Sequence, residues 1–265
     1  EVVASPANAS KIYSTNKNQE DRKEVAEAMA EAYAKNKNTY AEIINGVFQY
    51  RWANAQLRGY ESCLDAVLGS NNIPKDVYIN LIDVASNNTE SLLKYRELRK
   101  KALGLEKYYG SDYALELVDF EKTYSYDEAT VFVKECLKPM GKEYNDLLSS
   151  AMQAGWVDVY EKEGKRGCAY SWEIPGVHPY ILMNWAETRD NVFTLAHEFG
   201  HSIHSMLASK YQPYTYTNYA SMVAEPASTF KEKMLLDSML HKATSPEEEI
   251  TLLVQAIDTI TVTFY

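Results

Sequence analysis

Residues 197–201 read His-Glu-Phe-Gly-His, and their types and spacing are suited to metal-assisted hydrolysis. On a helix, two histidines four positions apart lie on one face, about 6 Å apart along the axis, so both imidazoles can reach one ion. Zinc accepts such nitrogen ligands at about 2.0–2.1 Å. Glu198 directly follows the first histidine, where a carboxylate can take a proton from a metal-bound water. The motif therefore predicts His197 and His201 as zinc ligands and Glu198 as a general base.

The alternative interpretation is that both histidines are ordinary helix residues, because this short motif also occurs by chance. The surrounding helix is strongly apolar, and unpaired polar groups are costly there. Its apolar residues include Val192, Phe193, Leu195, Ile203 and Met206. This setting favours the metal-binding interpretation.

Catalytic zinc takes three protein ligands and keeps one open position. The downstream candidates for the third ligand are Glu225, Glu232, Asp237 and His241. Glu225 stands among apolar residues, where a carboxylate needs a partner such as a cation.

Two further residues could support a metal site. Glu232 is seven positions after Glu225, on the same helical face, and could accept a hydrogen bond from a ligand histidine. The alternative for Glu232 is a solvated charge between Lys231 and Lys233. We expect His204 to support the site or to pack, rather than to bind the metal.

The motif must be held by the elements around it. Asp190 can cap a helix over 191–209, a second helix covers about 219–240, and Ser245-Pro246-Glu247-Glu248 begins a third. Upstream, the pattern predicts a helix over 18–68, a helix from Pro74 to Asn87, and a helix capped by Thr89 that stops at Gly104. A connection over 105–124 follows. The capping box at Ser125–Glu128 then starts a helix that reaches about 154.

Three short segments between these helices are predicted to be strands: 156–160, 168–173 and 179–184. The fold class is therefore mostly α (α+β), with a small sheet beside the metal-binding helix. If 179–184 is a sheet edge, an extended peptide can pair with it, and Tyr180 and Asn184 become candidate substrate contacts. The aromatic and glycine residues Gly167, Tyr170, Trp172 and Gly176 line that groove or simply pack the hairpin.

Composition narrows the function classes. With 46% hydrophobic and 24% charged residues, the chain has the composition of a globular protein. The net charge of −10 argues against nucleic acid as a partner. No apolar run approaches the ~20 residues of a membrane helix, so no membrane association is expected. Three widely spaced cysteines without a C-x-x-C pair suggest a reducing, cytoplasmic location. The oligomeric state stays open.

Residues 194–205 (TLAHEFGHSIHS) and 223–230 (VAEPASTF) together resemble the M3 family of zinc metallopeptidases, and within it the oligoendopeptidase F branch. The stretches 156–158 and 179–184 and the helical region 65–105 are similar to the same branch. The resemblance implies one zinc per chain held by His197, His201 and Glu225, with Glu198 as general base. It also implies a mostly helical, zincin-type catalytic domain with its site in a channel that admits short peptides.

The resemblance predicts a shortened helical N-terminal lobe at 1–110 and a catalytic domain at 111–265. One departure concerns the C-terminal side. The family carries a downstream glycine-rich loop with tyrosine and histidine side chains, whereas this sequence stops at Tyr265 within an apolar run. It also begins without methionine, which suggests a fragment.

The expected function is zinc-dependent hydrolysis of short oligopeptides. The alternatives are a metal-binding but catalytically incomplete fragment, a non-catalytic peptide-binding module, and a hydrolase of non-peptide amides. The presence of Glu198 argues against a purely structural metal site, because such a site has no need of an acid beside its ligand.

Overall fold

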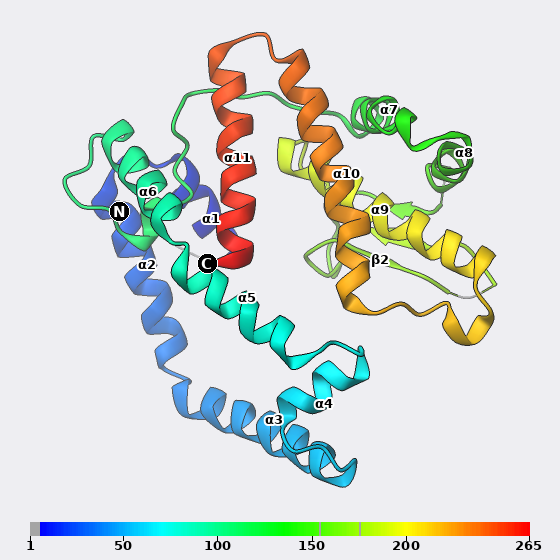
Figure 1. The fold of residues 1–265 in the computed structure, drawn as a ribbon. Coiled ribbons are helices and arrows are strands. Elements are labelled where there is room, and N and C mark those ends of the chain that lie inside the picture. Colours follow the sequence, from blue (N-terminus) through cyan, green and yellow to red (C-terminus); the bar gives the residue numbers. More distant parts are fainter. Residues whose placement is uncertain (1–5, 154, 175) are drawn as a thin grey trace. The chain divides into compact units, whose positions relative to one another are not determined.

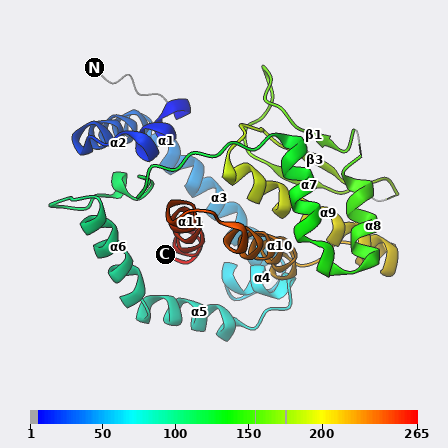
Figure 2. The same ribbon diagram turned by 90° about the horizontal axis from the view of Figure 1, so that it is seen from above.

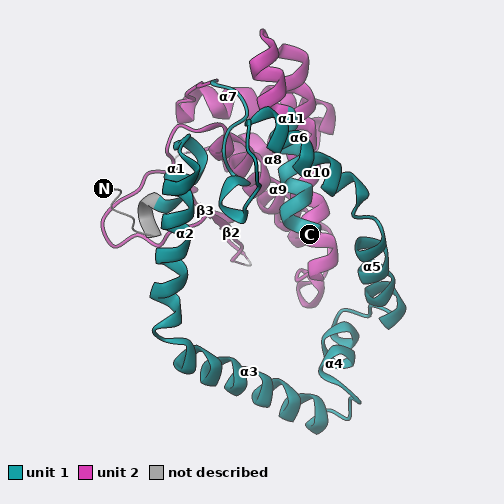
Figure 3. Cartoon of the chain, turned by 90° about the vertical axis from the view of Figure 1, so that its left-hand side faces the viewer, with its two compact units in different colours: residues 1–119, 253–265 teal, residues 120–252 magenta. Residues whose placement is uncertain are grey.

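The computed structural model describes residues 6–153, 155–174 and 176–265. The chain divides into two compact units, one of residues 1–119 with 253–265 and one of residues 120–252 (Figure 3). The boundary on the C-terminal side falls within the last helix, α11 (Pro246–Phe264). The predicted domain division at residue 110 stays a prediction, and each compact unit is described by itself.

The unit of residues 120–252 is built around α9 (Arg189–Tyr211). This helix packs against α10 (Ser221–Lys242), which crosses it in Figure 1, and it also contacts α7 (Tyr126–Cys136) and α8 (Lys142–Ala151), which lie near it in Figure 2. On another side, α9 contacts the small sheet. Its buried residues include Leu195, Phe199 and Ile203, all fully inaccessible to solvent. The helix that carries the histidine pair is thus the centre of this unit's core.

The sheet has three short strands: β1 (Val157–Asp158), β2 (Tyr170–Trp172) and β3 (Tyr180–Leu182). Their order is β1-β3-β2, with β1 parallel and β2 antiparallel to β3. Because β3 lies between the other two, the expectation that 179–184 could be a sheet edge is wrong. The edges are β1 and β2, and the local pattern could not reveal this order because all three segments are short and similarly apolar.

The unit of residues 1–119 and 253–265 is entirely helical in its described part. Its helices are α1 (Pro6–Thr15), α2 (Gln19–Ala34), α3 (Lys37–Leu57), α4 (Cys63–Ser70), α5 (Lys75–Asn87), α6 (Glu90–Ala102) and the end of α11. Arg22 on α2 is buried and forms an ion pair of 2.6 Å with Asp112, which lies in the short 3₁₀ helix Gly110–Asp112. This pair ties α2 to the connection that follows α6.

Several helix boundaries differ from the sequence prediction. The predicted helix over 18–68 is three helices, because the chain turns at 35–36 and again at Gly59, which has a φ of 76°. The predicted helix over 126–154 is two, since Gly141 takes a φ of 89° before α8. Helix α1 was not predicted. The three- and four-residue spacing of apolar residues continues across such breaks, so periodicity alone does not locate the ends of the helices.

The capping predictions had mixed outcomes. The capping box at Ser125 and Glu128 is confirmed, and Ser245 accepts a hydrogen bond from the Glu248 amide at the start of α11. Thr188, rather than Asp190, caps α9 through the Asn191 amide. Pro74 and Thr89 stand at the N-caps of α5 and α6 without a capping side-chain bond. The mostly helical fold with one small sheet is confirmed. Among the described residues, no helix combines the length and the apolar character needed to cross a membrane.

Candidate metal centre

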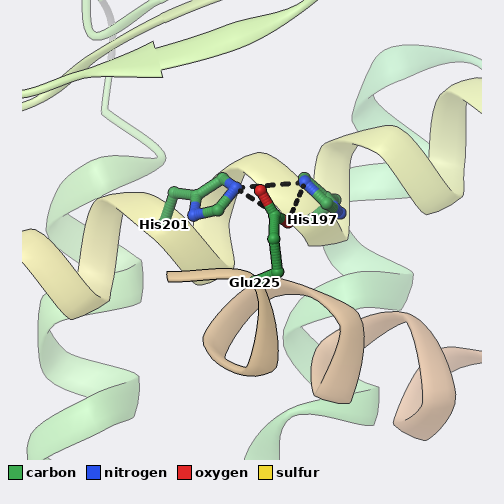
Figure 4. A group of neighbouring side chains, drawn as sticks. All are labelled: His197, His201 and Glu225. Atoms are coloured by element: carbon green, nitrogen blue, oxygen red, sulfur yellow. Dashed lines mark hydrogen bonds and ion pairs between the residues drawn. The ribbon is translucent and has the colours of Figure 1, made fainter. Parts of the chain in front are cut away.

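Two crossing helices carry the candidate site. His197, Glu198 and His201 lie on α9, and Glu225 and Glu232 lie on α10. Figure 4 shows Glu225 projecting from α10 toward the gap between the two imidazoles. The i, i+4 spacing on α9 places both histidines on the face that meets α10, as helix geometry requires.

A glycine lets the two helices approach closely. A Cβ added at Gly200 would lie 2.6 Å from the Cα of Ser228 and 2.7 Å from the carbonyl oxygen of Ala227. Real side-chain carbons do not approach backbone atoms so closely, so no larger residue fits at this position without moving α10. Gly200 therefore sets the distance between the histidine pair and Glu225. Its place within the His-Glu-Phe-Gly-His motif did not indicate this packing role.

The three candidate ligands form a compact triangle. The Nε2 atoms of His197 and His201 are 3.1 Å apart, and a carboxylate oxygen of Glu225 is 3.4 Å from the first and 3.6 Å from the second. A tetrahedral zinc ion with bonds of about 2.0–2.1 Å holds its ligand atoms about 3.3 Å apart. Two nitrogens and one carboxylate oxygen are also a donor set that zinc prefers. The residues present therefore fit one zinc ion, and they form the one such group found in the described part of the chain.

Glu232 orients the first histidine. Its Oε1 lies 2.6 Å from Nδ1 of His197, so the ring donates at Nδ1 and keeps the Nε2 lone pair directed at the triangle. Burial by itself would lower the pKa of His197, but the Glu232 hydrogen bond and charge outweigh it, and the pKa is raised. The supporting role considered for Glu232 thus agrees with its contact, whereas a freely solvated carboxylate does not.

Glu198 is the most unusual carboxylate of the site. It is 5% exposed, and its Oε2 is buried without a hydrogen-bond partner among the described residues. Burial raises its pKa to about 7, aided by the charge of Glu225 and opposed by His197 and by the backbone amide of Ser171. A carboxyl group whose pKa lies near neutral pH can both accept and release a proton.

The second histidine and its neighbour have lowered pKa values. Burial lowers the pKa of His201, and the charge of His197 adds to this effect. His204 lies one turn further along α9, outside the triangle. Its ring stacks on Tyr219 with centroids 3.8 Å apart, and Tyr219 in turn hydrogen-bonds Ser205 at 2.8 Å. His204 thus packs on Tyr219, and within the described part of the chain its buried Nδ1 has no hydrogen-bond partner.

The two candidate substrate residues on the third strand lie elsewhere. Tyr180 is on the central strand and is 40% exposed. The side-chain amide of Asn184 donates to the carbonyl oxygens of Arg166 and Cys168, so it braces the loop that precedes β2. The other ligand candidates, Asp237 and His241, face each other in an exposed pair near the end of α10.

Tyr170 and Trp172 were predicted as possible groove residues, but no role was predicted for Ser171 between them, whose backbone amide contacts Glu198. Ser171 on β2 approaches α9, where its Oγ lies 2.8 Å from that of Ser202. The available signal in the sequence was the alternation of aromatic and small polar residues over Tyr170–Trp172, which the structure places as exposed and half-buried positions. Of the tyrosines at and after the end of α9, Tyr219 packs on His204, whereas Tyr211, Tyr214 and Tyr216 are well exposed.

A mostly helical unit with a zinc-compatible His-His-Glu triangle and a buried carboxylate beside it has the features of a metallopeptidase domain. Comparison with known proteins agrees with this class. The family model of peptidase family M3 matches residues 12–264. This chain belongs to peptidase family M3.

Individual relatives are similar over most of the chain. Oligopeptidase PepF of Bacillus subtilis is 39% identical over 237 residues, which are 89% of this chain and 35% of that protein. The plasmid oligoendopeptidase F of Lactococcus lactis subsp. cremoris is 36% identical over 244 residues, which are 91% of this chain and 40% of that protein. The chain thus spans less than half the length of these curated relatives.

Solved structures share the fold. A crystal structure from Chlamydophila abortus superimposes with a TM-score of 0.81 at 39% identity, covering 98% of this chain and 44% of that one. The crystal structure of oligoendopeptidase-F from Enterococcus faecium gives a TM-score of 0.65 at 24% identity, covering 99% and 40%.

Proposed function

We propose that this chain carries the metal centre of a zinc-dependent endopeptidase that hydrolyses short oligopeptides. The observation that carries the proposal is the convergence of His197, His201 and Glu225 beside a buried carboxylate with an unpartnered oxygen. The similarity to oligopeptidase PepF and oligoendopeptidase F supports short peptides as the substrate class. One zinc ion per chain is the cofactor we infer.

In the proposed mechanism, His197, His201 and Glu225 hold the ion. A zinc ion held by these residues would supply Lewis-acid chemistry, polarising a carbonyl oxygen and lowering the pKa of a water toward ~7. Glu198 accepts the proton of the attacking water and later donates it to the leaving amine. Glu232 keeps His197 in the tautomer that offers Nε2 to the ion.

The substrate backbone needs a partner that holds it extended. We infer that the edge strand β2, rather than β3, pairs with the peptide, because among the described residues no strand lies on the other side of β2. This strand also contacts α9, and the backbone amide of Ser171 meets Glu198. A peptide on β2 lies next to the helix that carries Glu198. Residues 111–265, the proposed catalytic domain, contain all of these groups.

The three cysteines are all free thiols. Free thiols persist where glutathione and thioredoxin keep them reduced. This supports the proposal of a cytoplasmic location.

Metal content tests the ligand set. The chain, purified and loaded with zinc, should hold about one equivalent by mass spectrometry. Glu225→Ala should release most of the metal, because two ligands remain, whereas Asp237→Asn, an exposed carboxylate on the same helix, should retain it. Unchanged zinc in Glu225→Ala would exclude this ligand. Full zinc without cleavage of any quenched oligopeptide would favour the alternative of a metal-binding but non-catalytic chain.

A further inference from the structure

The outward side of the edge strand β2 is aromatic. Side chains alternate between the two faces of a strand. Ser171 faces α9, where it meets Ser202, so Tyr170 and Trp172 project from the opposite face of the sheet. They are 40% and 65% exposed. An exposed tryptophan on a strand edge leaves a large apolar surface uncovered.

The aromatic surface continues onto the central strand. Trp172 is directly opposite Tyr180 in the antiparallel register. The ring of Tyr180 contacts His178 with centroids 4.4 Å apart, and His178 stacks on Trp156 at 3.9 Å. On the inner face, Ile181 is only 3% exposed. The sheet therefore presents a packed side toward α9 and an aromatic side away from it.

The side chains of a peptide paired with β2 would lie on both faces of the sheet. Its side chains alternate like those of any strand, and directly opposed residues of paired strands have Cβ atoms about 4.5–5.5 Å apart. Every second peptide side chain would lie on the outer face, next to Tyr170 or Trp172. Tyr180 is one strand further away and is screened from the peptide by β2.

We propose that Tyr170 and Trp172 are specificity-determining residues, which favour apolar and aromatic peptide side chains at alternate positions on either side of the cleaved bond. This inference rests on the proposed peptidase function and deepens it. The contact is a binding interaction away from the reacting atoms, so it acts on KM more than on kcat.

A positional scan tests whether the preference for apolar and aromatic side chains recurs at every second peptide position. Short quenched peptides of alanine and glycine, each with one phenylalanine moved along the chain, are compared as substrates of the zinc-loaded protein. We expect kcat/KM to rise about 3- to 10-fold at every second position and not at the positions between, as an aromatic contact predicts. Trp172→Ala should flatten this alternation, and Trp172→Phe should restore most of it.

A matched control separates this effect from loss of any exposed ring. Tyr160 follows the opposite edge strand, β1, and is 61% exposed. Tyr160→Ala should leave the alternation unchanged. Zinc content checks that each variant keeps the metal centre.

Binding gives a second readout that does not need turnover. The same peptides, labelled with a fluorophore, are titrated against the zinc-loaded Glu198→Gln variant and followed by anisotropy. Cleavage with a flat scan, or with an alternation that Trp172→Ala does not change, overturns the inference while the peptidase function stands. Alternating affinity without any cleavage by the unmodified chain supports the inference and removes the peptidase function. A flat binding scan without cleavage overturns both.

Discussion

Two buried carboxylates, one in each compact unit, differ in their hydrogen bonding. Asp112 is fully buried and accepts hydrogen bonds from Arg22 at 2.6 and 3.1 Å, from Gln19 at 2.7 Å and from the Tyr109 amide at 2.8 Å. Glu198 is nearly as buried, yet its Oε2 has no hydrogen-bond partner in the part of the chain that the structure describes, and its pKa is raised to about 7. A satisfied buried charge holds a fold together, whereas an unsatisfied one is a candidate for chemistry.

The helices around these residues show the same contrast. Helix α9 has 23 residues and buries ten of them, including Phe199 and Gly200. Helix α3 has 21 residues and buries only Ala55, so apolar residues such as Phe48 stay exposed. Both helices are rich in apolar residues, and only α9 is enclosed by neighbours on several sides. The candidate site lies where the packing is dense enough to hold side chains in place.

The largest expected effects come from neutralising the two carboxylates. Asp112→Asn should cost about 3–5 kcal/mol of unfolding free energy, because Arg22 would stay buried without its counter-charge. Glu198→Gln should cost little stability and keep zinc, but lower turnover about 10²–10⁴-fold, since an amide cannot accept the proton. Urea unfolding and peptide hydrolysis, measured on both variants, check this. Equal loss of stability in the two variants would contradict the proposed difference between a carboxylate that stabilises the fold and one that takes part in chemistry.

A pair of phenylalanines probes the packing. Phe199→Ala removes a fully buried ring and should destabilise the protein by about 3–5 kcal/mol. Phe48→Ala removes a ring that is 64% exposed and should change stability by no more than about 0.5 kcal/mol. Chemical denaturation gives both values. A large cost for Phe48→Ala would mean that α3 is covered in solution.

Two helical glycines extend the comparison of α9 with α3, because the same substitution to alanine should change stability in opposite directions. Gly200→Ala should destabilise by about 1–3 kcal/mol and weaken zinc binding, since the new methyl group meets the backbone of α10. Gly46→Ala, in α3, meets nothing within 4 Å and should stabilise by about 0.5–1 kcal/mol. Thermal unfolding and zinc titration test the pair. Stabilisation by both substitutions would show that α9 and α10 can separate without cost.

The smallest effect is a pH dependence at the start of α11. Burial opposes ionisation of Glu248, but hydrogen bonds from Lys122 at 2.7 Å and from the Thr244 amide at 3.0 Å outweigh it, and the pKa is lowered. Because the folded pKa lies below the unfolded one, this stabilisation is present above the unfolded pKa of ~4.3 and is lost as pH falls through the folded pKa.

We expect about 1 kcal/mol from these hydrogen bonds. Glu248→Gln should remove that part of the acid-induced loss of stability in denaturation curves recorded from neutral to acidic pH. Glu249→Gln, its exposed neighbour, serves as the control. An unchanged acid profile in Glu248→Gln would assign the loss to other carboxylates.

Local sequence patterns predicted the features that depend on near neighbours. The Ser125 capping box, the Ser245 cap of α11 and the positions of the three strands are all present, although the strands are shorter than predicted. The merged helix over 18–68 was wrong, because a turn at Gly59 depends on backbone conformation rather than on periodicity. The metal ligands, general base and substrate contacts stay predictions, for which the structure supplies the geometry.

By itself, the sequence determined that His197 and His201 share one helix face, because the period of the α-helix leaves no other arrangement for residues four apart. Only the tertiary structure decided the rest of the site. Glu225 reaches both histidines because Gly200 lets α10 cross α9 at close range, and the pKa of Glu198 is raised because the surrounding core excludes water. Strand order also emerged only in three dimensions, since pairing joins segments that are distant in the chain. Long-range packing sets these distances and this burial, and no local pattern contains them.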